Sequence, residues 1–311
     1  MTKTKTKMPK QKQKDTVHQP VLLSEVIDVL APKPGESYLD LTGGYGGHGS
    51  AIFAHTKAEK GSVLVDRDEQ AVEALRARFK DSGAQIVRGD FLNALKELSA
   101  EGRKFDLILA DLGVSSPHLE DADRGFAFSL SGPLDMRMDR SQELRAYDLV
   151  NASSQEELKR ILIDYGEEPQ AGRIASAIAA NRPIDNTKDL AAIIARTAGF
   201  RARHAKTHPA TRSFQALRIA VNDELGQLEQ ALPLMSELLA AGGRMAVISF
   251  HSLEDRIVKQ FLADKAGNRY DSELELLTKR PITASRDELV SNPRARSAKL
   301  RAAAKIKTKK G

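Results

Sequence analysis

A glycine-rich stretch, Asp40-Leu-Thr-Gly-Gly-Tyr-Gly-Gly-His-Gly49, has the residue types that most clearly fit ligand chemistry. It follows a short apolar run and contains Gly44-x-Gly46-x-x-Gly49, the spacing of a dinucleotide-binding turn. Glycines there let the backbone bend sharply and let a ligand approach the main chain without meeting a Cβ atom. The stretch lacks a Gly-Lys-Ser/Thr ending, so it does not predict a nucleoside-triphosphate P-loop. A purely structural glycine turn stays open as the alternative.

Two carboxylates favour an adenosyl ligand at this turn. Asp40 ends the apolar run just before the glycines. There it would repel a pyrophosphate, but it could pair with the ammonium or balance the sulfonium of S-adenosylmethionine. Asp66 ends the next apolar run, which suits a carboxylate that accepts hydrogen bonds from both hydroxyls of a ribose. The pair therefore favours S-adenosylmethionine as the cofactor.

Two further apolar runs end in residues that suit the same ligand. Gly89-Asp90-Phe91 closes one run, at a place from which an aromatic ring can cover an adenine. Core packing of Phe91 is the more common case and stays open. The run of residues 105–111 is long enough to cross a sheet, so we expect Asp111 at the carboxyl edge, where open α/β sheets bind ligands. Capping of the next turn is the alternative role for Asp111.

Short apolar runs must position these residues. They cover residues 38–41, 63–66, 86–90, 105–111 and 244–251. Most of them are followed by a stretch with the apolar spacing of a helix. A first helix is predicted before them, over residues 20–30. This alternation predicts an α/β fold, a doubly wound parallel sheet with helices on both faces.

The last two runs lie much farther apart than one crossover helix requires. Between them, residues 155–165, 171–180 and 190–197 show helical apolar spacing. We therefore predict an inserted helical domain, residues 119–213, within a sheet domain of residues 17–118 and 214–311. A basic tail, residues 1–16, precedes it.

Composition narrows the class of protein. The chain has 311 residues, of which 29% are charged and 41% hydrophobic, so we expect a soluble globular protein and neither a membrane-spanning nor a collagen-like one. The absence of cysteine excludes disulfides, thiolate metal sites and cysteine nucleophiles. It also predicts a cytoplasmic location.

The charge is segregated along the chain, although the net charge is only +6. Residues 1–14 carry six lysines and no acid, and residues 291–311 carry eight lysines and arginines and no acid. A basic island without acids covers residues 190–222. Such segregation is typical of proteins that bind a phosphate backbone. For residues 1–14, a disordered solubilising tail is the alternative.

A series of longer motifs resembles one family, the bacterial small-subunit ribosomal RNA cytosine-N4 methyltransferases (RsmH, also called MraW). The similarity covers nearly the whole chain. The matching stretches are Asp40-x-Thr42-x-Gly44-x-Gly46-Gly47-His48, Asp66-Arg-Asp68, Asp111-Leu-Gly-Val-Ser-Ser-Pro117, Arg124-Gly-Phe-Ala-Phe128, Gly132-Pro-Leu-Asp-Met-Arg-Met-Asp139, His208-Pro-Ala-Thr-Arg-Ser-Phe-Gln-Ala-Leu-Arg218, Ile248-Ser-Phe-His-Ser-Leu-Glu-Asp-Arg256 and Asn292-Pro-Arg-Ala-Arg-Ser-Ala-Lys-Leu-Arg301.

The resemblance implies a class I S-adenosylmethionine-dependent methyltransferase fold, Rossmann-like, with a helical insertion. It implies methylation of the N4 exocyclic amine of one cytidine in the decoding region of small-subunit ribosomal RNA, within the assembled or assembling subunit. The family more usually has Gln at the position of His118. By matching motif positions, the expected cofactor-binding residues are Gly46, Gly47, His48, Asp66, Phe91, Asp111 and His118.

Asp111 is also the candidate catalytic residue. The amine of cytosine is a poor nucleophile because its lone pair is delocalised into the ring, and a carboxylate that accepts its N–H bonds would help to localise that pair. A target base must leave its stack and lie between aromatic or apolar side chains. Phe126, Phe128 and Phe214 are candidates for this, with core packing as the alternative, and Arg137, Arg212 and Arg218 are candidates for phosphate contacts.

No metal site is predicted. His204 and His208 have i, i+4 spacing, but no Glu follows His204 and Pro209 disfavours helix at His208. His251 is expected to be structural. Two other functions stay open: a nicotinamide-dependent oxidoreductase, which Asp40 and the absence of a Tyr-x-x-x-Lys pair disfavour, and a non-catalytic RNA-binding assembly factor.

Overall fold

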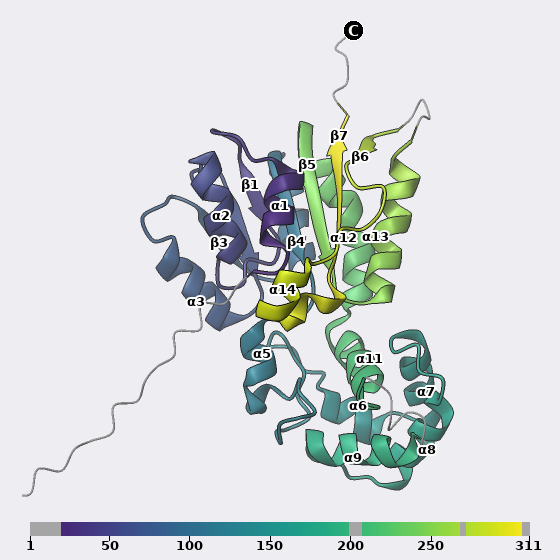
Figure 1. The fold of residues 1–311 in the computed structure, drawn as a ribbon. Helices are drawn as coiled ribbons and strands as arrows, with labels where there is room; N and C mark the ends of the chain where they lie inside the picture. The colour runs from purple at the N-terminus through teal and green to yellow at the C-terminus, as the bar shows by residue number, and fades with distance from the viewer. Residues whose placement is uncertain (1–19, 199–206, 268–271, 307–311) are drawn as a thin grey trace, which may run out of the picture.

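Seven strands form one sheet in the order β3-β2-β1-β4-β5-β7-β6 in this computed structural model (Figure 1). Strands β1 to β5 are parallel, whereas β7 is antiparallel to both β5 and β6. The strand order reverses direction between β1 and β4, which makes the carboxyl ends of these two strands the switch point where open α/β sheets bind ligands. The strands are β1 Tyr38–Asp40, β2 Val63–Asp66, β3 Gln85–Arg88, β4 Phe105–Asp111, β5 Leu239–Ser249, β6 Leu274–Leu276 and β7 Lys299–Lys305.

The structure describes residues 20–198, 207–267 and 272–306. The predicted basic tail, residues 1–16, and His204 lie outside the described residues. Within the described ranges, no helix is long and apolar enough to cross a membrane.

The predicted apolar runs form β1 to β5, and two of them match their strands residue for residue. The predicted doubly wound parallel sheet is confirmed for β1 to β5, and at one edge β6 and β7 add an antiparallel pair that was not predicted. The segment of β7, Lys-Leu-Arg-Ala-Ala-Ala-Lys, has weak strand propensity. It forms a strand because it pairs on both sides, with β5 and with β6.

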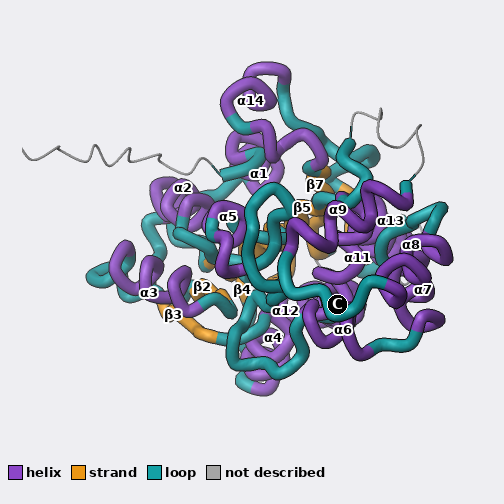
Figure 2. Tube along the Cα trace, turned by 90° about the horizontal axis from the view of Figure 1, so that it is seen from below, coloured by secondary structure: helices purple, strands orange, loops and turns teal. Residues whose placement is uncertain are grey.

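Helices cover both faces of the sheet (Figure 2). On one face pack α1 Leu23–Leu30, α2 Gly47–Thr56 and α3 Glu69–Arg78. On the other pack α4 Phe91–Ala100, α12 Glu224–Leu238 and α13 Ser252–Lys265. Successive residues of a strand point to opposite faces, so Leu107 and Leu109 enter one core while Ile108 enters the other. Burial on both faces explains the nearly continuous apolar runs of the sequence.

The helical insertion has a hydrophobic core of its own and lies on the side of the sheet where the parallel strands end (Figure 1). The predicted helices are confirmed as α7 Gln155–Asp164, α8 Ala171–Ala180 and α9 Thr187–Thr197. Between β4 and α7 lie α5 Ser116–Glu120, the 3₁₀ helix η1 Ala122–Arg124 and α6 Ala146–Ala152. Helix α11, Thr211–Asn222, spans residue 213, and its Phe214 and Leu217 pack in this core.

The C-terminal motif, residues 292–301, forms the 3₁₀ helix η2 Pro293–Ser297 and the first part of β7. Helix α14 Arg286–Ser291 leads into η2, and β7 follows directly. Ala295 and Ala298 are buried in the core beneath α1 and α2. The motif therefore belongs to the folded sheet domain.

We expect Leu300→Ala to lower the free energy of unfolding by about 2–5 kcal/mol, because Leu300 is fully buried in an interior strand and its loss leaves a cavity. Urea unfolding followed by circular dichroism measures this. Val290→Ala is the control, since Val290 is 85% exposed and its change should stay within about 0.5 kcal/mol. Equal effects of the two substitutions would contradict an interior position for β7.

Candidate functional site

The glycine turn lies between β1 and α2, and its geometry requires glycine. Gly44 and Gly46 have φ of +51° and +77°, in the left-handed region that residues with a Cβ rarely adopt. A Cβ on Gly46 would also lie 2.7 Å from the ring of Phe79 and 2.8 Å from the side chain of Arg78. The turn therefore packs closely on the end of α3. The N-terminus of α2 is thus held at the carboxyl edge of β1.

Asp40 and Asp66 stand at the ends of β1 and β2 and hold this turn. Oδ2 of Asp66 accepts a hydrogen bond from the backbone N–H of Gly44 at 2.8 Å. Asp40 is 1% exposed and accepts from the hydroxyl of Tyr38 at 2.8 Å and from the backbone N–H of Thr42 at 3.1 Å. Both carboxyl groups thus act on the conformation of the turn itself.

Asp111 ends β4 next to the same turn. Its backbone N–H donates to Oγ1 of Thr42 at 2.6 Å, and its Oδ2 lies 3.7 Å from Nδ1 of His48. The other ring nitrogen of His48 contacts the carbonyl oxygen of Val21 at 3.0 Å. Oδ1 of Asp111 is buried and has no hydrogen-bond partner among the residues that the structure describes. The fold therefore brings His48 and Asp111 together and leaves one buried acceptor oxygen of Asp111 without a hydrogen-bond partner among the described residues.

Burial raises the pKa values of the carboxyl groups at this edge. Burial raises the pKa of Asp40 to about 6 and also raises the pKa of Asp66. Burial, and then the nearby charges of Asp40 and Glu254, raise the pKa of Asp111 well above its usual value. A cation beside such groups favours their ionised form. The carboxyl groups at this edge therefore fit a ligand with positively charged groups, such as the sulfonium and ammonium groups of S-adenosylmethionine.

Asp68 connects the sheet to the start of the insertion. Its Oδ2 lies 2.8 Å from Nε2 of His118 and accepts from Arg124 at 2.6 Å. Burial opposes ionisation, but these two partners outweigh it and hold the pKa of Asp68 well below its usual range. The other ring nitrogen of His118 lies 3.1 Å from Oγ of Ser115, and the ring stacks on Phe126 with centroids 5.1 Å apart. Both nitrogens of His118 thus have protein partners.

In the sequence Asp68 was recognisable only as part of the Asp66-Arg-Asp68 motif, and its role in this link was not predicted. The signal was present: Asp68 precedes a helix-period stretch, and it caps α3 by accepting from the backbone N–H groups of Gln70 and Ala71. Its second oxygen is therefore directed away from the helix. The link to His118 and Arg124 depends on the tertiary fold and has no local signal.

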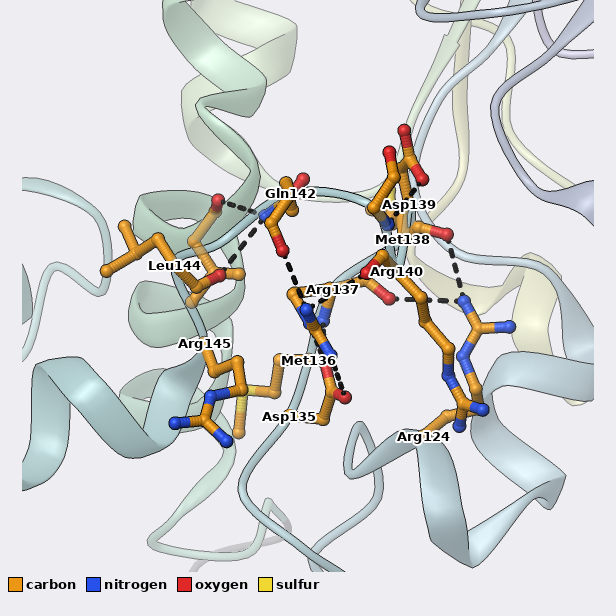
Figure 3. A network of polar contacts seen from close by, with 12 residues as sticks. Arg124, Asp135, Met136, Arg137, Met138, Asp139, Arg140, Gln142, Leu144 and Arg145 are labelled. Carbon is orange, nitrogen blue, oxygen red and sulfur yellow. Dashed lines mark hydrogen bonds and ion pairs between the residues drawn. The ribbon is translucent and has the colours of Figure 1, made fainter.

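Arg137 holds a loop of the insertion together (Figure 3). Its guanidinium donates to both carboxylate oxygens of Asp135, at 2.8 and 2.9 Å, and to the carbonyl oxygens of Arg140 and Gln142. Arg124 donates to the carbonyl oxygen of Met138 in the same loop (Figure 3). Four of its five N–H groups are therefore engaged within this loop, and a phosphate contact of Arg137 stays a prediction.

Arg218 also has a protein partner, and its phosphate contact stays a prediction. Its guanidinium donates to both carboxylate oxygens of the buried Glu224, each at 2.8 Å. Glu224, His251 and Glu254 bring side-chain atoms within 4.8 Å of one another, so the group is a buried ion-pair network. His251 caps α13 through Nδ1, which confirms the predicted structural role. Of the three arginines, Arg212 alone is exposed.

The predicted aromatic residues have different environments. Phe91 begins α4, is 9% exposed and packs in the core, and its contact with an adenine stays a prediction. Phe126 and Phe214 are buried, which is the packing alternative. Phe128 is half-buried and stacks on the exposed His208, with ring centroids 4.5 Å apart and planes 16° apart. Phe128 is therefore the one of the three candidates that the structure leaves accessible.

A class I S-adenosylmethionine-dependent methyltransferase is the class of protein that this sheet order and this site define. The family profile described as the MraW methylase family matches residues 15–306, and the chain belongs to that family. The family resemblance of the sequence motifs is thereby confirmed.

Three relatives are each named "Ribosomal RNA small subunit methyltransferase H". The protein of Heliobacterium modesticaldum is 46% identical over 312 residues, covering 93% of this chain and 99% of the relative. That of Methylococcus capsulatus is 48% identical over 301 residues, covering 91% and 99%. That of a Synechocystis species is 45% identical over 299 residues, covering 94% of each chain. The chain is thus similar to these relatives over almost its whole length.

We expect the affinity for S-adenosylmethionine to fall about tenfold as the pH drops from 7 to 5. The pKa of Asp40 is about 6, so most Asp40 is protonated at pH 5, and apparent affinity scales with the fraction in the binding-competent ionised form. Isothermal titration calorimetry across this range measures the slope. The Asp40→Asn variant cannot ionise and should bind weakly without that slope. A slope of the same size in both proteins would contradict a role for Asp40.

The stability of the ligand-free protein should change with pH in the opposite direction to the affinity: it should fall as the pH rises. A carboxyl group whose pKa is raised on folding stabilises the fold below its unfolded value of about 3.9, and this stabilisation is lost as the pH rises through 6. Thermal unfolding without ligand is therefore a second check on Asp40.

We expect Arg124→Ala to lower the free energy of unfolding by about 3–5 kcal/mol, because it leaves the buried carboxylate of Asp68 without its guanidinium partner. Urea unfolding measures the loss. Arg88→Ala is the matched control: Arg88 pairs with Glu69 at 2.8 Å on the surface, where such pairs contribute about 0–1 kcal/mol. A small loss for Arg124→Ala would show that the Asp68 contact does not stabilise the link to the insertion.

Proposed function

We propose that the protein transfers the methyl group of S-adenosylmethionine to the N4 exocyclic amine of one cytidine in the decoding region of small-subunit ribosomal RNA. The reaction takes place in the cytoplasm, on the assembled or assembling small subunit. The names of the relatives support a small-subunit RNA substrate. The observation that carries the proposal is the open acceptor Oδ1 of Asp111, at the switch point of the sheet and a few residues before the insertion.

The cofactor site in this proposal is the carboxyl edge around the glycine turn. The crowded carboxyl groups of Asp40, Asp66 and Asp111 support a cationic ligand there, because each of their pKa values is raised. His118 acts through Asp68 and Ser115, whose contacts use both of its ring nitrogens. The residues that we assign to this site are Gly46, Gly47, His48, Asp66, Phe91, Asp111 and His118.

S-adenosylmethionine supplies an electrophilic methyl carbon when it is bound, so the protein mainly has to place the amine. Oδ1 of Asp111 accepts an N–H bond of the cytosine amine, which helps to localise the nitrogen lone pair. Nδ1 of His48 lies 3.7 Å from the other oxygen of Asp111, beside the proposed position of the amine. The exclusion of water from this buried edge strengthens the interaction.

The insertion, predicted as residues 119–213 and extended to Asn222 by helix α11, recognises the RNA in this proposal, and residues 17–118 and 223–311 form the methyltransferase domain. The target base leaves its stack and enters between the two. Phe128, with His208 stacked on it, offers a flat surface for that base. Support for this assignment comes from the exposure of His208 and the partial exposure of Phe128.

The experiment that tests the function uses labelled S-adenosylmethionine. The protein is incubated with deproteinised ribosomal RNA or with small subunits that lack the modification, and the labelled nucleoside is identified by mass spectrometry. We expect N4-methylated cytidine. Label in any other nucleoside would overturn the cytosine-N4 assignment, and the comparison of the two substrates decides between free RNA and the subunit.

We expect Asp111→Asn to lower turnover by more than tenfold while the fold is retained, because the amide keeps the shape of the side chain but lacks the negative charge and one of the two acceptor oxygens. Single-turnover methylation of small subunits measures the effect. Asp81→Asn, on an exposed turn after α3, is the control and should not change turnover. Wild-type turnover in Asp111→Asn would remove this residue from the mechanism.

A further inference from the structure

A hollow lies at the N-terminus of α13, outside the candidate cofactor site. Its volume is about 300 Å³, at the lower end of the range for small-molecule pockets, which is room for a phosphate group and part of a sugar. Its polar lining comes from three segments: the start of α13, the loop before α14, and the C-terminal motif in η2 and β7. The polar lining residues are His251, Ser252, Thr283, Arg296, Ser297 and Lys299.

The lining carries positive charge and no carboxylate. Arg296 is exposed, and no acid among the described residues pairs with it. Lys299 lies 3.0 Å from Asp255, but that carboxylate is shared with Arg301 at 2.7 Å, so two cations face one anion. Together with Arg296 the surroundings of the hollow keep an excess of positive charge.

The acids nearest to the hollow are already engaged. Glu254 is 2% exposed and accepts from the backbone N–H of Phe250 at 2.8 Å. Glu167, from the insertion, accepts from Ser252 and pairs with Arg256 at 2.7 Å. The hydroxyl groups of Thr283 and Ser297 lie in the lining with the cations. An anion with several acceptor oxygens suits this combination of guanidinium, ammonium, hydroxyl groups and helix N-terminus.

The hollow lies close to the candidate catalytic residue. Phe250 forms part of its wall and packs against the loop that follows Asp111, since a Cβ on Gly113 would lie 3.3 Å from the Phe250 ring. Arg294, at the start of η2, pairs with Glu120 of α5 at 3.1 Å. In Figure 1 the segment around α14 lies at the lower end of the strands, on the side of the insertion. One RNA strand can therefore reach both the hollow and the region of Asp111.

We propose that this hollow binds a backbone phosphate of the RNA strand, next to the nucleotide that enters the methyl-transfer site. The proposal rests on the proposed function, because it takes the substrate to be RNA. It gives the C-terminal motif of residues 292–301 a substrate-binding role in addition to its place in the fold. Arg296 is the residue that contacts the phosphate directly, and Lys299 adds to the positive field.

The test compares Arg296→Ala with Arg280→Ala, which removes the same charge from an exposed position outside the hollow. Binding to small subunits that lack the modification is measured over a range of salt concentrations. For Arg296→Ala we expect about tenfold weaker binding and a salt slope smaller by about 0.7–0.9, the loss of one phosphate contact. Arg280→Ala should leave both unchanged, and Arg296→Lys should recover most of the affinity. Melting temperature and S-adenosylmethionine affinity report on the fold and should not move.

Phosphate-ethylation interference identifies the contact itself. With the wild-type protein, ethylation of one phosphate beside the target cytidine should weaken binding, and with Arg296→Ala that effect should disappear. Unchanged affinity in Arg296→Ala, equal losses in both variants, or the same interference pattern as the wild type would each overturn the proposal. These are binding measurements, so a wild-type protein that binds the subunit but methylates another nucleoside would refute the proposed function and leave this result separate.

Discussion

Three carboxyl groups, the buried Asp40 and the half-buried Asp66 and Asp111, lie at the carboxyl edge of one sheet, and the loss of hydration that raises the pKa of each, with a smaller effect of neighbouring charges, is the constraint around which the site is arranged. Neighbouring donors offset it in part: the backbone N–H of Gly44 for Asp66, and the hydroxyl of Tyr38 for Asp40. These neutral donors do not cancel the negative charge of the ionised carboxyl groups. The site therefore favours a cationic ligand. The ligand-free site is thus electrostatically incomplete.

A separate ion-pair system fixes the insertion to this edge. Asp68 belongs to the sheet domain, Arg124 belongs to the insertion, His118 is the last residue before it, and all three side chains are buried. At the other end of the insertion, Arg218 of α11 pairs with Glu224 of α12. Both chain crossings between the two parts therefore carry a buried charge pair. Such pairs require specific partners, and they hold the RNA-binding part of the proposed site in one position relative to Asp111.

The sequence was sufficient for features that local pattern determines. Strands β2 and β4 have the predicted bounds, and the helical insertion was evident from the long interval between two apolar runs. The pairing of charged side chains has no such pattern, even between residues that are close in the sequence. Arg137 and Arg218 looked like phosphate-binding residues because their partners, Asp135 and Glu224, are recognisable only once the loop and the helix junction are folded. Strand β7 was missed because its alanines and charged ends owe their strand conformation to two flanking partners.

The antiparallel position of β7 has a consequence for how the chain is made. The free edge of β5 finds its neighbour only in residues 299–305, which follow it by some fifty positions along the chain. During synthesis the ribosome therefore releases β1 to β5, and the whole insertion between them, before the sheet can close. Until then the edge of β5 is unpaired and open to wrong association. A protein whose relatives are named as ribosomal RNA methyltransferases thus depends on the translating ribosome to pass residue 305 before its own sheet is complete.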